Sequence, residues 1–215
     1  MPLSNLELVN EFAKDYDKNI LKNIWNGPQV IFDETREFIS SGNLILDLGI
    51  GTGESSKRFQ EANCIIIGLD GSPKMLELCK AKNIGKKLVL QNLEETPFPL
   101  KTDAFNGIIS NGVFHLTNPI KPIFSEAKRI LKSKGIFAFS FENSDDVSSY
   151  CEIEKGVWMM KAESGVFTYK YSEQYIVELL NQNNFTVHTH KQFLAYVDNE
   201  LQKETFFTII VAQLK

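Results

Sequence analysis

The sequence has few cysteines and histidines, and it has no long hydrophobic run. Its three cysteines and three histidines among 215 residues form no metal-ligand spacing such as Cys-x-x-Cys. The apolar runs are strand-sized, whereas a membrane-spanning helix needs about 20 apolar residues. The first residues also lack the basic segment and apolar run of a signal peptide. We therefore expect a cytoplasmic protein with free thiols, no metal site and no membrane partner.

An excess of positive charge is missing as well. The chain carries 23 Lys and Arg residues against 27 Asp and Glu residues, which gives a formal net charge of −4. A nucleic-acid-binding protein normally shows a basic patch or stripe, so we expect no nucleic-acid partner. The composition, with 43% hydrophobic and 23% charged residues, is typical of a globular protein.

The spacing of apolar residues predicts a single α/β domain over residues 1–215. Residues 5–24 and 30–39 have helical periods and would form an N-terminal helical cap over residues 1–40. From Leu44 onward, short apolar strands alternate with helices, which favours a parallel sheet with crossover helices on both faces. Near the C-terminus, two long apolar segments flank a polar turn and predict an antiparallel hairpin at one sheet edge.

Residues 142–171 interrupt the alternation of strands and helices. They contain several aromatic residues without a clean period, and we interpret them as an insertion after the fifth strand. A loop of this kind can form a lid over a substrate pocket or a small satellite core of its own. As a lid it would contribute Tyr150, Trp158, Met159 and Phe167 to the pocket of an apolar or flat substrate.

The most informative segment is Asp47-Leu48-Gly49-Ile50-Gly51-Thr52-Gly53-Glu54, at a predicted turn from strand to helix. Glycines there let the backbone approach a ligand closely. Glu54 occupies the position that a dinucleotide fingerprint fills with Gly or Ala, and no Gly-Lys-Ser/Thr of a P-loop follows. The acid Asp47 beside the loop disfavours a pyrophosphate and favours a cationic ligand. S-adenosylmethionine, with its ammonium and sulfonium groups, has this charge.

A second acid, Asp70, ends the next predicted strand, 19 residues after Gly51. A carboxylate at that strand end can accept hydrogen bonds from both hydroxyls of a ribose. The alternative is that the glycines only form a tight turn and that Asp70 only caps the helix beginning at Pro73. Three alternate glycines preceded by one acid and followed by another favour a nucleoside site over a plain turn.

These residues resemble the class I S-adenosylmethionine-dependent methyltransferases, and more closely the methyltransferase-11/25-like group. The resemblance extends through the segments 44–54, 65–79, 91–99, 103–116 and 123–140. It implies a Rossmann-like three-layer sandwich whose seven-stranded, mostly parallel sheet has the order 3-2-1-4-5-7-6, with strand 7 antiparallel. It also implies S-adenosylmethionine as cofactor.

The resemblance assigns roles to individual residues. The methionine part of the cofactor would contact the glycine-rich turn, and Asp70 would hold the ribose. Gly71 and Met75 would pack near the adenine, and Asn92-Leu93 would read its edge, although Asn92 replaces a commoner Asp and could instead be a turn residue. Tyr16 belongs to a helix segment that closes over the cofactor in many relatives. It could reach the cofactor or the substrate, and the alternative is that it packs in the core. The cofactor-binding set is Tyr16, Asp47, Gly49, Gly51, Gly53, Asp70, Gly71, Met75, Asn92, Leu93 and Asn111, the last through its backbone carbonyl.

Methyl transfer needs alignment and exclusion of water more than it needs acid–base catalysis. His115 is the candidate general base, with a pocket or helix-start role as its alternative. Methylases that act on amino groups of bases or of glutamine carry an Asn/Asp-Pro-Pro-aromatic run, which this chain lacks. It also lacks the Pro-Cys pair of cytosine-C5 enzymes. The cluster of acids that metal-assisted methyl transfer needs after the fourth strand is absent as well. We therefore expect a small-molecule acceptor. A non-catalytic protein that binds S-adenosylmethionine is the main alternative, and a nicotinamide-dependent reductase is a remote one.

Overall fold

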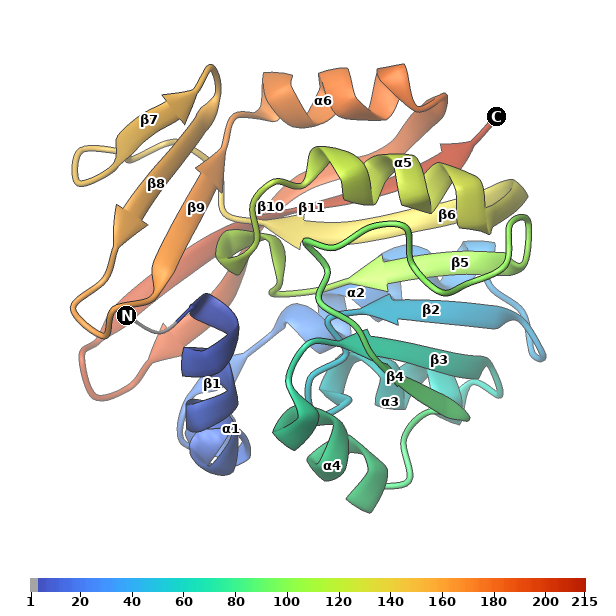
Figure 1. The fold of residues 1–215 in the computed structure, drawn as a ribbon, viewed down its shortest axis with the longest axis horizontal. Coiled ribbons are helices and arrows are strands. Elements are labelled where there is room, and N and C mark those ends of the chain that lie inside the picture. The colour runs from blue at the N-terminus through green and yellow to red at the C-terminus, as the bar shows by residue number, and fades with distance from the viewer. Residues whose placement is uncertain (1–3) are drawn as a thin grey trace.

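A computed structural model describes residues 4–215, apart from the side chains of residues 14, 15 and 19–21. A large sheet runs through the molecule, and a smaller sheet stands at one end (Figure 1). The elements in chain order are α1 (Asn5–Lys22), β1 (Ile24–Trp25), α2 (Gly27–Thr35), η1 (Arg36–Phe38), β2 (Leu44–Leu48), α3 (Glu54–Glu61), β3 (Ile65–Asp70), α4 (Pro73–Ala81), β4 (Lys87–Leu90), β5 (Phe105–Ser110), η2 (Phe114–Leu116), α5 (Lys121–Ile130), β6 (Leu131–Phe141), β7 (Cys151–Glu154), β8 (Val157–Lys161), β9 (Phe167–Tyr171), α6 (Glu173–Gln182), β10 (Phe185–Asp198) and β11 (Lys203–Leu214).

The large sheet confirms the predicted Rossmann-like class. Its strand order is β1-β10-β11-β6-β5-β2-β3-β4. Without β1, this is the expected order 3-2-1-4-5-7-6 read from the other end, and β11 is antiparallel to both neighbours. The expected count of seven was one too low, because residues 24–25 pair with β10 as an additional edge strand.

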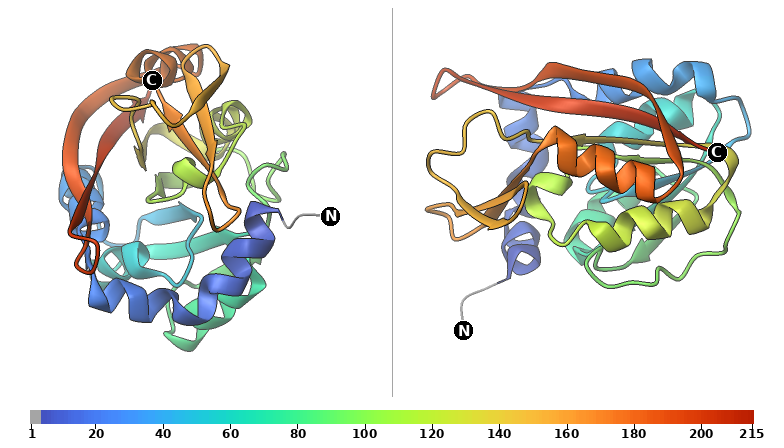
Figure 2. Two further views of the ribbon diagram at one scale, coloured as in Figure 1. Left: turned by 90° about the vertical axis from the view of Figure 1, so that its left-hand side faces the viewer. Right: turned by 90° about the horizontal axis from the view of Figure 1, so that it is seen from above.

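Helices cover both faces of the sheet, as the alternating pattern predicted. Helices α5 and α6 pack on one face, whereas α2 and α3 lie on the other (Figure 2). The first core contains a group of aromatic rings in which Phe139 lies 5.3 Å, centroid to centroid, from both Phe114 and Phe124. The second core is aliphatic and centres on Ile45, Ile66 and Ile109. Burial of apolar side chains on both faces explains why the central strands read as nearly continuous apolar runs.

The insertion has more order than its sequence suggests. Strands β7, β8 and β9 form an antiparallel three-stranded sheet of their own. Tyr171, at the end of β9, is fully buried, and its hydroxyl donates to the backbone carbonyl of Thr117 at 2.5 Å. This hydrogen bond fastens the insertion to the loop that follows η2.

The N-terminal segment crosses the carboxyl ends of the parallel strands. Helix α1 curves around this end of the molecule and contacts α4 (Figure 2). The second predicted helix ends earlier than expected, because α2 stops at Thr35 and a short η1 follows it. Over residues 4–215, no helix combines the length and the apolar character needed to cross a membrane.

We predict that Tyr171→Phe lowers the free energy of unfolding by about 1–3 kcal/mol, because the buried Thr117 carbonyl loses its donor. Urea denaturation followed by circular dichroism measures this change. Tyr150→Phe is the matched control, since the Tyr150 hydroxyl is partly buried and contacts a side-chain hydroxyl, Thr168 Oγ1, at 3.2 Å. Equal stability of the two variants would contradict an anchoring role for Tyr171.

Candidate functional site

The turn between β2 and α3 has the geometry that its glycines permit. Gly49, Gly51 and Gly53 all have positive φ angles, of 75°, 54° and 91°. A Cβ atom on Gly49 would lie 2.5 Å from a methyl group of Val113, so a larger residue has no room there. The N–H groups of Gly49 and Ile50 both donate to the carbonyl of Leu69, at 2.8 and 3.0 Å. The loop is thus folded back against the end of β3.

Asp70 completes this arrangement at the end of β3. Its Oδ2 accepts from the Gly51 N–H at 2.8 Å, and its Oδ1 accepts from the Ser72 N–H at 2.8 Å. Burial raises the pKa of Asp70, while these backbone hydrogen bonds oppose that shift. A carboxylate has about four acceptor positions, so Asp70 keeps capacity for hydroxyl groups of a ligand.

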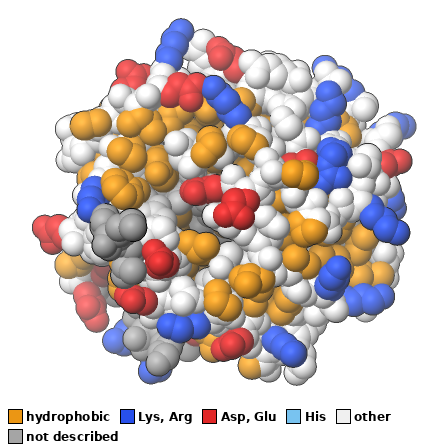
Figure 3. All heavy atoms as spheres, in the orientation of Figure 1, with side chains coloured by type: hydrophobic (Ala, Val, Ile, Leu, Met, Phe, Trp, Pro, Cys, Tyr) orange, Lys and Arg blue, Asp and Glu red, His pale blue; other side chains and the backbone are white. Residues whose placement is uncertain are grey.

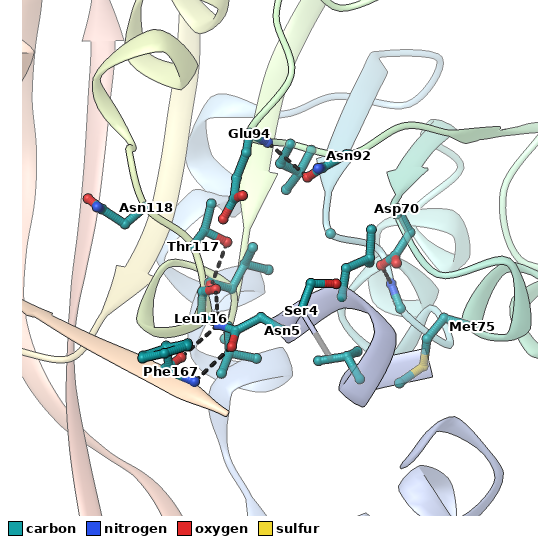
Figure 4. A pocket seen from close by; sticks show the side chains of 18 of the residues that line it. Ser4, Asn5, Asp70, Met75, Asn92, Glu94, Leu116, Thr117, Asn118 and Phe167 are labelled. Carbon is teal, nitrogen blue, oxygen red and sulfur yellow. Dashed lines mark hydrogen bonds between the residues drawn. The ribbon is translucent and has the colours of Figure 1, made fainter. Parts of the chain in front are cut away.

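A cavity of about 410 Å³ opens between this turn, α1 and the insertion. Figure 4 shows Asp70 and Met75 on one side of it, with Leu116, Thr117 and Phe167 across from them. Glu94 also lines the cavity, and acidic side chains lie near the hollow at the middle of this face (Figure 3). Among the described lining residues there are two carboxylates and no Lys, Arg or His. The charge suits a cationic ligand.

Helix α1 forms the wall across from the glycine-rich turn, and polar contacts hold it at three points. Asn5 donates to the carbonyls of Leu116 and Phe167 at 3.0 and 2.7 Å, and it accepts from the Phe167 N–H. Asn10 accepts from the Ser72 hydroxyl at 2.8 Å.

The third contact of α1 reaches the turn itself. Asp17 accepts from the Thr52 hydroxyl at 2.7 Å and pairs with Lys82 at 2.8 Å. Lys82 also pairs with Glu54 at 2.6 Å. Helix α1 is therefore tied to the insertion, to the start of α4 and to the glycine-rich turn.

A second cavity, of about 340 Å³, lies next to the first and shares Tyr16 and Gly112 with it. Its other lining residues are Trp25, His115, Glu142, Tyr196, Thr205 and Phe207. Burial lowers the pKa of His115 to about 4, so its ring is neutral near pH 7. The ring of Phe207 lies 5.3 Å from His115 and 6.1 Å from Trp25, centroid to centroid.

Comparison with known proteins matches this architecture. The family model of the methyltransferase domain matches residues 46–139. Uncharacterized protein MJ1252 of Methanocaldococcus jannaschii is 31% identical over 208 residues, which cover 93% of this chain and 75% of that protein. The chain belongs to the class I S-adenosylmethionine-dependent methyltransferases. The cofactor of this methyltransferase is S-adenosylmethionine.

Other relatives cover the chain to different extents. An uncharacterized methyltransferase of Anoxybacillus flavithermus is 30% identical over 116 residues, and the match spans 51% of this chain and about half, 53%, of that protein. A possible histamine N-methyltransferase of Thermotoga maritima superposes with a TM-score of 0.73 at 16% identity, covering 98% of this chain and all of its own. The 1,6-didemethyltoxoflavin-N1-methyltransferase of Burkholderia thailandensis gives 0.70 at 16% identity, covering 100% of this chain and 92% of its own. At these identities the solved structures show the fold.

The structure brings most of the predicted cofactor residues of this methyltransferase to the first cavity. The residues of that set that line it are Tyr16, Gly49, Gly51, Asp70, Gly71, Met75, Asn92 and Leu93. The Asn92 side chain accepts from the Glu94 N–H at 3.1 Å and donates to Glu95 at 3.4 Å. It therefore also forms the local turn that was its alternative interpretation. The side chains of Lys14 and Asp15, in the helix segment that carries Tyr16, lie outside the described part.

Asp47 does not line the cavity, although the sequence suggested a place beside the cofactor. Its side chain is 2% exposed and accepts from the Ser56 hydroxyl at 2.7 Å. Burial raises the pKa of Asp47 to about 7. The reason is its position within β2, one residue before the strand ends, where the side chain bonds to α3 and joins the strand to that helix.

Gly53 and Asn111 also lie outside both cavities. Gly53 begins α3, and a Cβ there would meet Ile84 at 2.8 Å, so this glycine serves helix packing. The side-chain Nδ2 of Asn111 donates to the Ser55 hydroxyl at 3.0 Å, and its side-chain Oδ1 accepts from the Ser140 hydroxyl at 2.8 Å. These contacts connect β5, α3 and β6 beneath the site.

Of the four predicted pocket residues in the insertion, Phe167 alone lines the first cavity. Tyr150, Trp158 and Met159 line neither cavity. Trp158 and Met159 pair along β8 with Lys170 and Tyr169 of β9, and the Lys170 ammonium lies 5.0 Å from the centre of the Tyr150 ring. Trp158 and Met159 thus belong to the small sheet, and all three side chains are half-buried rather than part of either core.

Residues that the sequence did not single out complete the site. Asn5 and Asp17 each act through a partner far away in the chain, and Glu94 lines the first cavity, although the resemblance assigned none of the three a role. Over the described residues, no group of three or more His, Cys, Asp or Glu side chains is placed to hold a metal ion.

We predict that Asp47→Asn stabilises the protein increasingly as pH rises. The folded pKa of Asp47, about 7, exceeds its ordinary value of 3.8, so between these values the folded state holds a proton that the unfolded state has lost. Stability from Asp47 therefore falls as pH rises through this window. The free energy of unfolding of the variant minus that of the wild type should increase by about 2 kcal/mol from about pH 5 to about pH 8.

Urea titrations at several pH values measure this difference, in which the titrations of all other groups cancel. The asparagine side chain of the variant keeps an acceptor for the Ser56 hydroxyl, so the variant should fold. A difference that does not change with pH would mean that Asp47 is ionised in the folded protein throughout.

Proposed function

We propose that this methyltransferase transfers the methyl group of S-adenosylmethionine to a small-molecule acceptor, with the cofactor in the first cavity. The observation that carries the proposal is the placement of Asp70 beside Gly49 and Gly51 on the wall of a cavity whose described charged residues are carboxylates. In this arrangement the ribose hydroxyls donate to the free acceptor positions of Asp70. The ammonium and sulfonium groups fit the acidic surroundings.

The other lining residues suggest how the cofactor lies. Met75 and Leu93 offer apolar contacts to the adenine, and Leu6 of α1 packs over Gly71, where a Cβ would meet it at 2.7 Å. Asn92 stands at the same end of the cavity. Tyr16 and Gly112 border the other end, where the second cavity begins, and the reactive methyl group would point there.

The adjoining second cavity favours catalysis over the alternative of cofactor binding alone. A protein that only holds the cofactor needs no second cavity beside it, whereas methyl transfer needs a place where the acceptor is aligned with the donor. The size of this space, about 340 Å³, is at the small end of the roughly 300–1,000 Å³ of ligand pockets. It supports a small molecule as acceptor.

We predict that Asp70→Ala weakens binding of S-adenosylhomocysteine, the demethylated cofactor, by more than about tenfold. Hydrogen bonds to a charged acceptor contribute roughly 1.5–3 kcal/mol each, and about 1.4 kcal/mol corresponds to tenfold in affinity. Isothermal titration calorimetry measures the affinity, and Asp70→Asn, which keeps one acceptor oxygen, should lose less. Asp33→Ala, an exposed change on α2, is the control.

Circular dichroism must show that the Asp70 variants fold, because Asp70 also holds the Gly51 turn. An Asp70→Ala protein that folds and binds with wild-type affinity would place the ribose elsewhere. Absence of heat with both S-adenosylmethionine and S-adenosylhomocysteine in the wild type would remove the proposed site altogether.

We also predict that Asp17→Ala speeds the release of S-adenosylhomocysteine by about threefold or more, since α1 loses its contacts with Thr52 and Lys82. Partly exposed ion pairs and hydrogen bonds of this kind contribute about 1 kcal/mol. Stopped-flow dilution of the complex measures the rate. Glu11→Ala is an exposed change on the same helix and should leave the rate unchanged; equal rates for the two variants would exclude α1 from gating the cavity.

A further inference from the structure

The second cavity is lined by an unusual share of rings. Tyr16 comes from α1, Trp25 from β1, His115 from η2, Tyr196 from β10 and Phe207 from β11. We infer that this cavity is the acceptor site and that the acceptor is a small, planar, electrically neutral aromatic compound with an oxygen or nitrogen nucleophile. The inference rests on the proposed function, because it assumes that the methyl donor occupies the first cavity.

Flatness follows from how the rings are fixed. The Trp25 indole packs directly over Gly27 and Gly112, where Cβ atoms would lie only 2.4 and 3.1 Å from the ring, so these glycines seat it against the backbone. Phe207 is 5% exposed and meets Trp25 edge to face, with an interplanar angle of 77°. Fixed aromatic walls gain most from a flat ring, which can stack on one face and meet another edge-on.

Neutrality follows from the charges around the cavity. Glu142 is the carboxylate among its described lining residues, and the Lys170 ammonium lies 3.2 Å from it, so the pair compensates itself. The same surroundings disfavour a positive charge on His115, because burial lowers the pKa of this residue. An ammonium ligand would pay a similar desolvation cost, and it would also face the sulfonium of the donor.

His115 offers one polar contact to such a ligand. Its Nδ1 is buried and has no hydrogen-bond partner among the described residues, which leaves Nε2 as the nitrogen that a ligand can reach. A buried nitrogen without a partner is tolerated better as a bare acceptor than as an N–H. His115 therefore presents Nε2–H to the cavity and donates to a polar substituent of the acceptor, in place of the general-base role that the sequence suggested.

The transfer itself needs no further reactant. A lone pair on the acceptor oxygen or nitrogen forms the new bond to the methyl carbon. The carbon–sulfur bond breaks, and its electron pair stays on the sulfur, which becomes neutral. The proton of the acceptor passes to water.

The two tryptophans of the chain, Trp25 and Trp158, make the test direct. In the full-length Trp158→Phe variant, Trp25 is the only indole and reports on the second cavity. With S-adenosylhomocysteine present in excess, its emission is titrated with four compounds that share a methyl-substituted six-membered ring: 4-methylphenol, 4-methylbenzoate, 4-methylbenzylammonium and 4-methylcyclohexanol. We expect a saturable change with 4-methylphenol, and binding at least about tenfold weaker for the two ions and for the non-planar alcohol.

Two further variants in this background locate the binding. Phe207→Leu should weaken the binding of 4-methylphenol by about fivefold or more, because leucine keeps the apolar volume but removes the flat ring. Phe206→Leu is the same change at the next residue, which is 43% exposed and lines neither cavity, and should have no effect. Equal affinity of the two variants would overturn the location.

Tightest binding of the ammonium compound or of the alcohol would overturn the inferred class, and a failure of all four compounds to bind would overturn the site. Calorimetry with S-adenosylhomocysteine on the same protein separates these outcomes from failure of the proposed function. Cofactor heat without binding of any compound leaves the methyltransferase proposal standing and removes this one.

Discussion

The arrangement of the site depends on one contact, the hydrogen bond from the Gly51 N–H to the Asp70 carboxylate. It joins the glycine-rich turn after β2 to the end of β3, where the carbonyl of Leu69 already accepts from two N–H groups of the same turn. Because both strands end at the same edge of the sheet, a single carboxylate can fix the turn and still face the cavity. The remaining walls, α1 and the insertion, are then placed relative to this fixed point.

The sequence was sufficient for features that depend on local pattern. Alternating apolar strands and helices predicted the layers, and the expected helix beginning at Pro73 is present, with the Met75 N–H donating to the Ser72 hydroxyl at its start. The glycine spacing located the turn. Strand β1 escaped prediction because two residues carry no periodicity, and they become a strand only by pairing with residues more than 170 positions away.

The parts of the site that the sequence could not supply are those that depend on side-chain direction and long-range contact. Asp47 and Asp70 are both acids near the turn, yet Asp47 lies within β2 and bonds to Ser56 of α3, whereas Asp70 is the last residue of β3 and lines the cavity. Likewise, Asn5 finds partners at Leu116 and Phe167 only after folding. No sequence pattern near these residues predicts such contacts.

The two cavities differ in a way that matters for a group transfer. The first has Asp70 and Glu94 on its walls, whereas in the second the single described carboxylate is compensated by Lys170. In the proposed reaction the donor enters the acidic cavity as a cation and leaves it with a neutral sulfur, so the attraction that loads the site weakens once the methyl group has gone. The neutral ring-lined cavity undergoes no such change, since a neutral acceptor yields a neutral product after its proton is lost. The change in charge thus favours loading of the donor and release of the demethylated cofactor, while the contacts of α1 at Asn5, Asn10 and Asp17 hold the remaining side of the cavity in place.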